Sequence, residues 1–139
     1  RRLRCFVRVL HNKSTSDIKR RISLAKQAFH NKNRFLTNKH LSIGVHKYDE
    51  IFVWSVLTYD SETWTMNKKY RSKLEATEMW MWRKTAETRW IDKMRNEQVL
   101  EEVPTREKQL MKIIESRKLK LVGHIIQHND FIIDILKEK

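Results

Sequence analysis

The 139-residue sequence has very little of what hairpin turns, disulfide bonds and membrane spans require. Two glycines and one proline supply few tight turns, so an all-α fold is favoured over a β-rich one. The single cysteine, Cys5, excludes an internal disulfide bond and gives no sign of a secreted scaffold. The longest apolar stretch, from Ile51 to Tyr59, is far shorter than the ~20 residues of a membrane-spanning helix. We therefore expect an intracellular protein, nuclear or cytoplasmic, without a membrane partner.

The sequence begins with Arg1 and not with Met, and no signal-peptide pattern precedes it, so we expect a piece of a longer protein. Its length suits one domain with a core that needs no disulfide bond or metal. We expect residues 1–13 to be a truncated remnant of a preceding domain and residues 14–128 to form one helical domain. Residues 129–139 would be a C-terminal tail.

Apolar residues at intervals of three and four predict a bundle of about four main helices. The first is expected from about Ser16 to Thr37, because Ser14 to Asp17 supplies helix-start residues before an apolar stripe. The second is centred on Ile51 to Tyr59. The residues that favour a helix there are Val45, Tyr48, Phe52, Val56 and Tyr59. We expect Trp54 and Leu57 to be buried in its core.

Three further helices are expected in the second half. One begins at an N-cap at Thr65 or Asn67 and runs to about Glu87, a short one spans Asn96 to Glu102, and the last begins near Thr105. Within the first of them, Met79 to Trp82 is expected to be core, with an exposed base-stacking surface as the alternative.

Two details complete the expected fold. Gly123 lies inside the last helix, where it is tolerable if another backbone comes close. At the N-terminus, basic and apolar residues alternate from Arg1 to Leu10, which fits a short strand. A frayed chain end is an equally good interpretation of that alternation.

Positive charge is concentrated in the first 40 residues, which contain 12 Lys or Arg against Asp17 alone. The rest of the chain has 18 basic against 16 acidic residues, so nearly all of the net charge of +13 lies near the N-terminus. Such clustering predicts a polyanion partner, most often nucleic acid, with a solubilising tail or an anionic membrane surface as alternatives. The candidate nucleic-acid-binding residues are Arg8, Lys13, Lys19, Arg20, Lys26 and Arg34. A merely solvated charged face would show the same pattern.

The sequence contains no complete motif for catalysis or metal binding. His124 and His128 stand four residues apart and could share a metal, but no H-E-x-x-H pattern or cysteine cluster completes the site. Gly44 and Gly123 are the only glycines, so no glycine-rich phosphate loop is present. We therefore predict no metal site, no cofactor and no self-sufficient catalytic site in this chain.

Four blocks in order resemble one protein family. They are D-I-K-R-R-I-S-L-A-K-Q-A-F (17–29), W-S-V-L-T-Y-D-S-E-T-W-T (54–65), K-L-E-A-T-E-M-W-M-W-R-K (73–84) and R-K-L-K-L-V-G-H-I-I-Q-H-N-D (117–130). Together they are similar to the C-terminal part of the endonuclease-reverse transcriptases of non-LTR (LINE-type) retrotransposons. The resemblance extends over nearly the entire chain, from about residue 10 to its end.

The resemblance implies the helical thumb and following segment of an RNA-directed DNA polymerase, which bind the template-primer duplex. The catalytic palm, with its paired aspartates and Mg²⁺, would lie upstream of Arg1 and act as a partner. Neither Tyr48-Asp49-Glu50 nor Tyr59-Asp60-Ser61 reproduces the palm motif, so this chain alone is expected to be inactive. The family usually has glycine where Asp60 stands. The alternative is a helical protein-interaction or DNA-binding module with no polymerase history.

Overall fold

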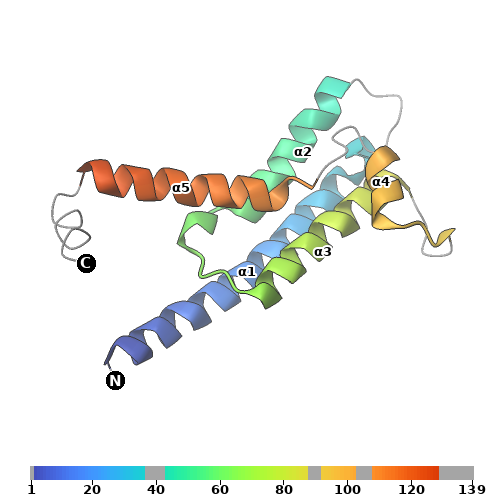
Figure 1. The fold of residues 1–139 in the computed structure, drawn as a ribbon. Coiled ribbons are helices and arrows are strands. Elements are labelled where there is room, and N and C mark those ends of the chain that lie inside the picture. The colour runs from blue at the N-terminus through green and yellow to red at the C-terminus, as the bar shows by residue number, and fades with distance from the viewer. Residues whose placement is uncertain (1, 37–42, 88–91, 103–107, 129–139) are drawn as a thin grey trace.

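The computed structural model describes residues 2–36, 43–87, 92–102 and 108–128, with side chains for 13–34 and from residue 50 onward within those ranges. All regular structure in these residues is helical (Figure 1). The helices are α1 (Arg2–Leu36), α2 (Ile43–Thr58), α3 (Lys68–Thr85), α4 (Asn96–Glu102) and α5 (Leu110–His128), with a 3-10 turn, η1 (Ser61–Thr63). The predicted all-α class is confirmed, with about five helices instead of four.

The predicted N-terminal strand is wrong, because α1 begins at Arg2 and includes the whole alternating segment. A lone strand leaves its backbone donors and acceptors unpaired, whereas extending an existing helix adds one hydrogen bond per residue. The 35-residue helix is ~50 Å long at ~1.5 Å per residue. It passes through residues 13 and 14 without a break, and the proposed domain division there stays a prediction.

Helix α2 confirms the helix expected around Ile51 to Tyr59, and Trp54 and Leu57 are buried with 7% and 0% exposure. In the stripe that indicated this helix, Val56 is half-buried against the core, but the two aromatic residues with described side chains are exposed. Phe52 and Tyr59 remain 49% and 61% exposed, because the core lies on the side of Val53, Trp54 and Leu57. The two exposed rings lie instead at the edge of α2 that faces cations of α1.

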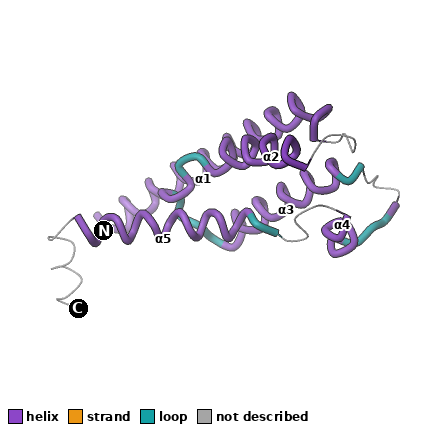
Figure 2. The backbone as a smooth tube through the Cα atoms, turned by 90° about the horizontal axis from the view of Figure 1, so that it is seen from above, coloured by secondary structure: helices purple, strands orange, loops and turns teal. Residues whose placement is uncertain are grey.

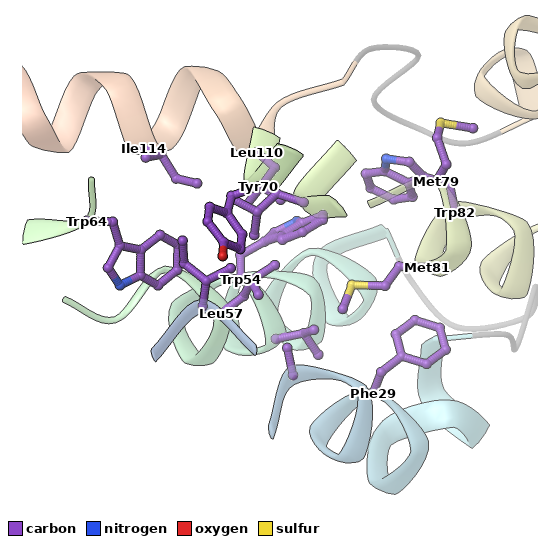
Figure 3. Packing of buried hydrophobic residues seen from close by; sticks show 14 of the residues in the cluster. Phe29, Trp54, Leu57, Trp64, Tyr70, Met79, Met81, Trp82, Leu110 and Ile114 are labelled. Carbon is purple, nitrogen blue, oxygen red and sulfur yellow. The ribbon is translucent and has the colours of Figure 1, made fainter. Parts of the chain in front are cut away.

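The core joins α1, α2, α3 and α5 (Figures 1 and 3). Its buried apolar residues are Ile18, Ala25, Phe29, Val53, Trp54, Leu57, Trp64, Tyr70, Leu74, Met79, Met81, Trp82, Val99, Leu110 and Ile114. The Trp54 and Trp82 rings meet edge to face with centroids 5.9 Å apart, a favourable aromatic geometry. Met79, Met81 and Trp82 are core as predicted, whereas Trp80 is only partly buried.

The connection from α2 to α3 is held by α1. Ser14 and Asp17, predicted to start a helix, lie inside α1 and act as acceptors instead. The Trp64 indole N–H donates to Asp17 (3.1 Å), and the Thr65 backbone N–H donates to the Ser14 hydroxyl (3.0 Å). Their short polar side chains therefore hold a distant segment in place, which no local pattern in the sequence indicates.

The turn that ends α2 places a non-glycine residue in a left-handed backbone conformation. Asp60 has φ 60° and ψ 18°, a conformation that glycine adopts without steric cost. Beyond the turn, the predicted N-cap Asn67 is confirmed, since its side-chain oxygen accepts from the Tyr70 N–H at 2.9 Å.

Helix α4 has the bounds predicted for it, Asn96 to Glu102, and is attached to α3. Arg83 of α3 donates to the Met94 carbonyl oxygen at 2.8 Å and to the Asn96 side chain at 2.9 Å. Val99 of α4 is fully buried against the core. A short helix that cannot persist alone is thus stabilised by tertiary contacts.

Helix α5 is anchored at its start by a buried carboxylate. Glu78 of α3 is fully buried, and one of its oxygens accepts from the Gln109 and Leu110 backbone N–H groups at 2.6 and 3.0 Å. These N–H groups have no partner within the helix, and a negative charge is favourable there. The predicted start near Thr105 lies outside the described residues.

Helix α5 packs on the core near its start, where Leu110 and Ile114 are buried. The idea that Gly123 permits close approach of another backbone is wrong, because nothing described lies within 4 Å of a Cβ built there. None of the helices, as far as they are described, has the length and hydropathy needed to cross a bilayer.

Candidate nucleic-acid interface

The predicted basic residues of α1 with described side chains point outward. Lys13, Lys19, Arg20 and Arg34 are exposed, and Lys26 is half-buried. None of the four exposed side chains forms a hydrogen bond or an ion pair with a described residue. Asp17, the one acidic residue of α1, accepts a hydrogen bond from Trp64. The positive charge of α1 is therefore left available to a partner in solution.

Helical geometry separates these cations into different faces of α1. Lys13, Arg20 and Arg34 are spaced by multiples of seven residues, close to whole numbers of turns at ~3.6 residues per turn. They consequently form one line along the solvent side, with steps of ~10 Å per seven residues. Lys19 and Lys26 are also seven apart, and they face α3. Arg8 lies in α1, but its side chain is outside the described part.

A groove of about 470 Å³ lies between α1 and α3. It is lined by Lys19, Ile22, Ser23 and Lys26 from α1 and by Lys73, Ala76, Thr77 and Trp80 from α3. Three of these residues are cationic and none is acidic. The groove is therefore electrostatically suited to an anionic ligand.

Trp80 forms an aromatic wall of this groove. Its ring meets Phe29 at 5.4 Å and His30 at 5.6 Å between centroids, both edge to face. The Lys26 ammonium lies over the ring, 5.1 Å from the centroid, in a cation–π contact. The ring thus contacts the buried Phe29 and the exposed His30, and a flexible cation lies over it.

On the opposite side of α1, two cations lie over aromatic rings of α2. The Arg21 guanidinium is 4.3 Å from the Tyr59 ring centroid, and the Lys32 ammonium is 5.8 Å from that of Phe52. Because residue 21 pairs with 59 and residue 32 with 52, the two helices are antiparallel. These contacts use cations for packing, in contrast to the solvent-facing line.

The structure brings together only part of the predicted site. Lys19 and Lys26 share the groove, whereas Lys13, Arg20 and Arg34 lie along another face. Lys73 was not predicted as a binding residue, and Trp80 was expected to be core, with an exposed base-stacking surface only as the alternative. Residues 76 and 77 follow residue 73 by three and four positions and precede residue 80 by four and three, which places all four on one face of α3. The pairing of that face with α1 could not be derived from spacing.

A second groove, of about 390 Å³, lies between α3 and α5 and is less suited to a polyanion. Its lining includes Glu115, whose carboxylate is 3.3 Å from the Arg71 guanidinium. Lys118 at the same groove donates to the Trp64 carbonyl oxygen at 2.6 Å. Burial lowers the pKa of Lys118, and the nearby Glu115 carboxylate partly offsets this. Arg71 and Lys118 are thus already engaged within the protein.

The two histidines of α5 lie side by side, with His124 and His128 ring centroids 4.5 Å apart. Among the residues that the structure describes, no third His, Cys, Asp or Glu joins them in a metal-binding group. The absence of a metal site from the whole chain stays a prediction.

Comparison with known proteins identified no relative: no protein-family model, no curated protein and no solved structure matches the chain significantly.

Proposed function

We propose that this chain is a helical module that binds nucleic-acid duplexes through α1, as the thumb region of a LINE-type reverse transcriptase would. The observation that supports the proposal most is the line of exposed cations Lys13, Arg20 and Arg34 on a ~50 Å helix, which have no ion-pair partner among the described residues. Neutralising phosphates along such a line releases condensed counterions, which supplies affinity without sequence specificity. The resemblance of the four ordered blocks gives the proposal its biological setting.

In that setting the chain would hold the template-primer duplex for a catalytic palm that lies elsewhere in a longer protein. The palm, with its Mg²⁺, would perform RNA-directed DNA synthesis, and the module would act in the nucleus or cytoplasm. A duplex-binding surface of this kind must slide over any sequence. Phosphate contacts suit this role because they position a protein without reading bases.

The salt dependence of duplex binding tests the proposal. If about four of the α1 cations contact phosphate, log affinity should fall against log salt with a slope of about −3 to −4. Unrelated duplex sequences should give the same slope, since few base contacts are expected. Replacing Lys19, Arg20 and Arg34 together by Gln should flatten the slope and lower affinity equally for all sequences.

An unchanged slope in that triple variant, with helix content intact by circular dichroism, would mean that these residues are only solvated charges. The protein-interaction module with no polymerase history would then be preferred. The sequence upstream of Arg1 provides an independent test, because a palm motif with paired aspartates supports the proposal and unrelated sequence opposes it. Primer extension by the isolated chain with Mg²⁺ or Mn²⁺ should stay at background, since two-metal chemistry needs clustered carboxylates.

A further inference from the structure

The α1–α3 groove differs in shape and chemistry from the outer face of α1. Its volume of about 470 Å³ falls in the range of small-ligand sites, ~300 to 1,000 Å³. A nucleic-acid duplex presents phosphates at its outside and keeps its bases stacked, so it can contact an exposed line of cations but cannot insert a base into a groove. An unpaired nucleotide can do so.

Trp80 provides the surface that a base would need. Trp54, Trp64 and Trp82 are no more than 7% exposed, whereas Trp80 is only partly buried and lines the groove. Phe29 and His30 meet it edge to face and hold its plane. The Lys26 ammonium, the end of a flexible side chain, lies over the ring. That face of the ring can be uncovered without disturbing the core.

We infer that the groove binds an unpaired nucleotide of a single-stranded nucleic acid. The base stacks on Trp80 in the place of the Lys26 ammonium, and Lys26 turns to the phosphate together with Lys19 and Lys73. Base stacking on an aromatic side chain combined with a cationic groove is the general mode of single-strand binding. The inference rests on the proposed function in one respect, since both assign nucleic acid to α1, but it concerns a different face and a different form of the ligand.

Little sequence preference is expected at this site. The Thr77 hydroxyl donates to the Lys73 carbonyl oxygen at 2.8 Å, so its proton is not available to a base. The other lining residues apart from Ser23 are apolar or cationic and cannot read both donors and acceptors on a base edge. Stacking accepts every base, because each has a π face.

Ala76→Glu tests the groove without removing any packing. Ala76 is exposed on α3 and lines the groove, and glutamate is a good helix former, so the variant should fold normally. Ser116→Glu on the exposed part of α5 is the matched control, with the same new side chain and the same charge change. The probes are a short fluorescent single strand of mixed sequence and the blunt duplex of the same sequence. We expect Ala76→Glu to weaken single-strand binding about tenfold and duplex binding no more than the control does.

Trp80→Leu separates stacking from charge. It should weaken single-strand binding about tenfold and leave the slope of affinity against salt unchanged, while Trp80→Phe should retain most of the affinity. Circular dichroism and an unchanged duplex affinity verify that the fold is intact. If Trp80→Leu binds the single strand as well as the wild type does, the base does not stack there and the inference is wrong.

Two further outcomes distinguish this inference from the proposed function. Equal losses for single strand and duplex in Ala76→Glu would overturn the separate groove site while leaving duplex binding by α1 in place. If the wild-type chain binds no duplex, the proposed function is refuted. If the groove variants of that chain also lose single-strand binding, the groove site is supported. Polyglutamate can compete for the cations of the groove but has no base to stack. If it displaces the single strand equally well from the wild type and from Trp80→Leu, the groove binds polyanions without recognising a base, and the inference is wrong.

Discussion

Helices α1 and α5 are both basic, yet they use their cations in opposite ways. Helix α1 has ten Lys or Arg against Asp17, and its exposed members reach into solvent without a described partner. Helix α5 has four Lys or Arg against Glu115, and two of them bind backbone carbonyl oxygens. Arg117 donates to Thr58 at the end of α2 at 3.1 Å, and Lys118 donates to Trp64.

The difference between α1 and α5 shows that the number of Lys and Arg residues in a helix does not give the number of cations that are available to a ligand. The last carbonyl groups of a helix have no partner within it, and a cation near them is favourable. Arg117 meets this need for α2, so its charge serves the fold. The exposed α1 cations Lys13, Lys19, Arg20 and Arg34 have no such carbonyl beside them among the described residues. We therefore expect substitutions in α5 to change stability and substitutions in α1 to change binding.

The largest effect is expected from the core that both helices share. Trp54→Ala should lower the free energy of unfolding by about 3–5 kcal/mol, because it removes a large buried ring that packs on Trp82. Urea denaturation followed by circular dichroism measures this. A loss below about 1 kcal/mol would mean that α2 is not central to the core.

The anchor of α5 should have the next largest effect. Glu78→Ala leaves two backbone N–H groups at the start of α5 without their acceptor and should cost about 2–3 kcal/mol of unfolding free energy. Glu75→Ala on the same helix is the control, since Glu75 forms only a partly exposed ion pair with Arg71 at 3.5 Å. Its loss should stay within about 0.5 kcal/mol. Equal losses in the two variants would contradict the role given to Glu78.

A pair of arginine substitutions compares the two helices directly. Arg117→Gln should lower stability by about 1–2 kcal/mol, because a charged hydrogen bond to the Thr58 carbonyl is lost. Arg20→Gln should change stability by less than about 0.5 kcal/mol, since Arg20 is exposed and unpaired among the described residues. Thermal unfolding of both variants in the same buffer gives the comparison. A larger loss of stability in Arg20→Gln than in Arg117→Gln would contradict the roles assigned to the two helices.

The smallest effect is a gain. Gly123→Ala should stabilise the protein by about 1 kcal/mol, because alanine restricts the unfolded chain and nothing described lies close enough to meet its Cβ. Urea denaturation again provides the measurement. A destabilised variant would indicate that a neighbour packs on Gly123 in solution and would restore the close approach expected from the sequence.

The sequence was sufficient for features that depend on local pattern. Helix α4 has its predicted bounds, Asn67 caps α3 as predicted, and Trp54 lies in the core. In each case the signal lies within a few residues of the feature. The N-terminal strand failed because an alternating basic and apolar segment is also compatible with a helix once a helix follows it.

What could not be predicted depends on contacts between distant segments. Glu78 binds the start of α5, 31 residues further along the chain, and Asp17 binds Trp64 across 47 residues. The groove also depends on contacts between distant segments, because Lys73 and Trp80 line it only where α3 lies beside Lys26 of α1. No periodicity in one segment reports its partner in another.

The most direct test of the account compares two charge-matched triple variants in duplex binding. One replaces Lys13, Arg20 and Arg34 of α1 by Gln, and the other replaces Arg95, Lys108 and Lys120, which are exposed outside α1. Both lower the formal net charge by three. We predict that the α1 variant shifts the slope of log affinity against log salt toward zero by about 2 to 3, whereas the other variant keeps nearly the wild-type slope. Equal changes in the two slopes would show that total charge, and not the exposed face of α1, determines binding, and would contradict the account.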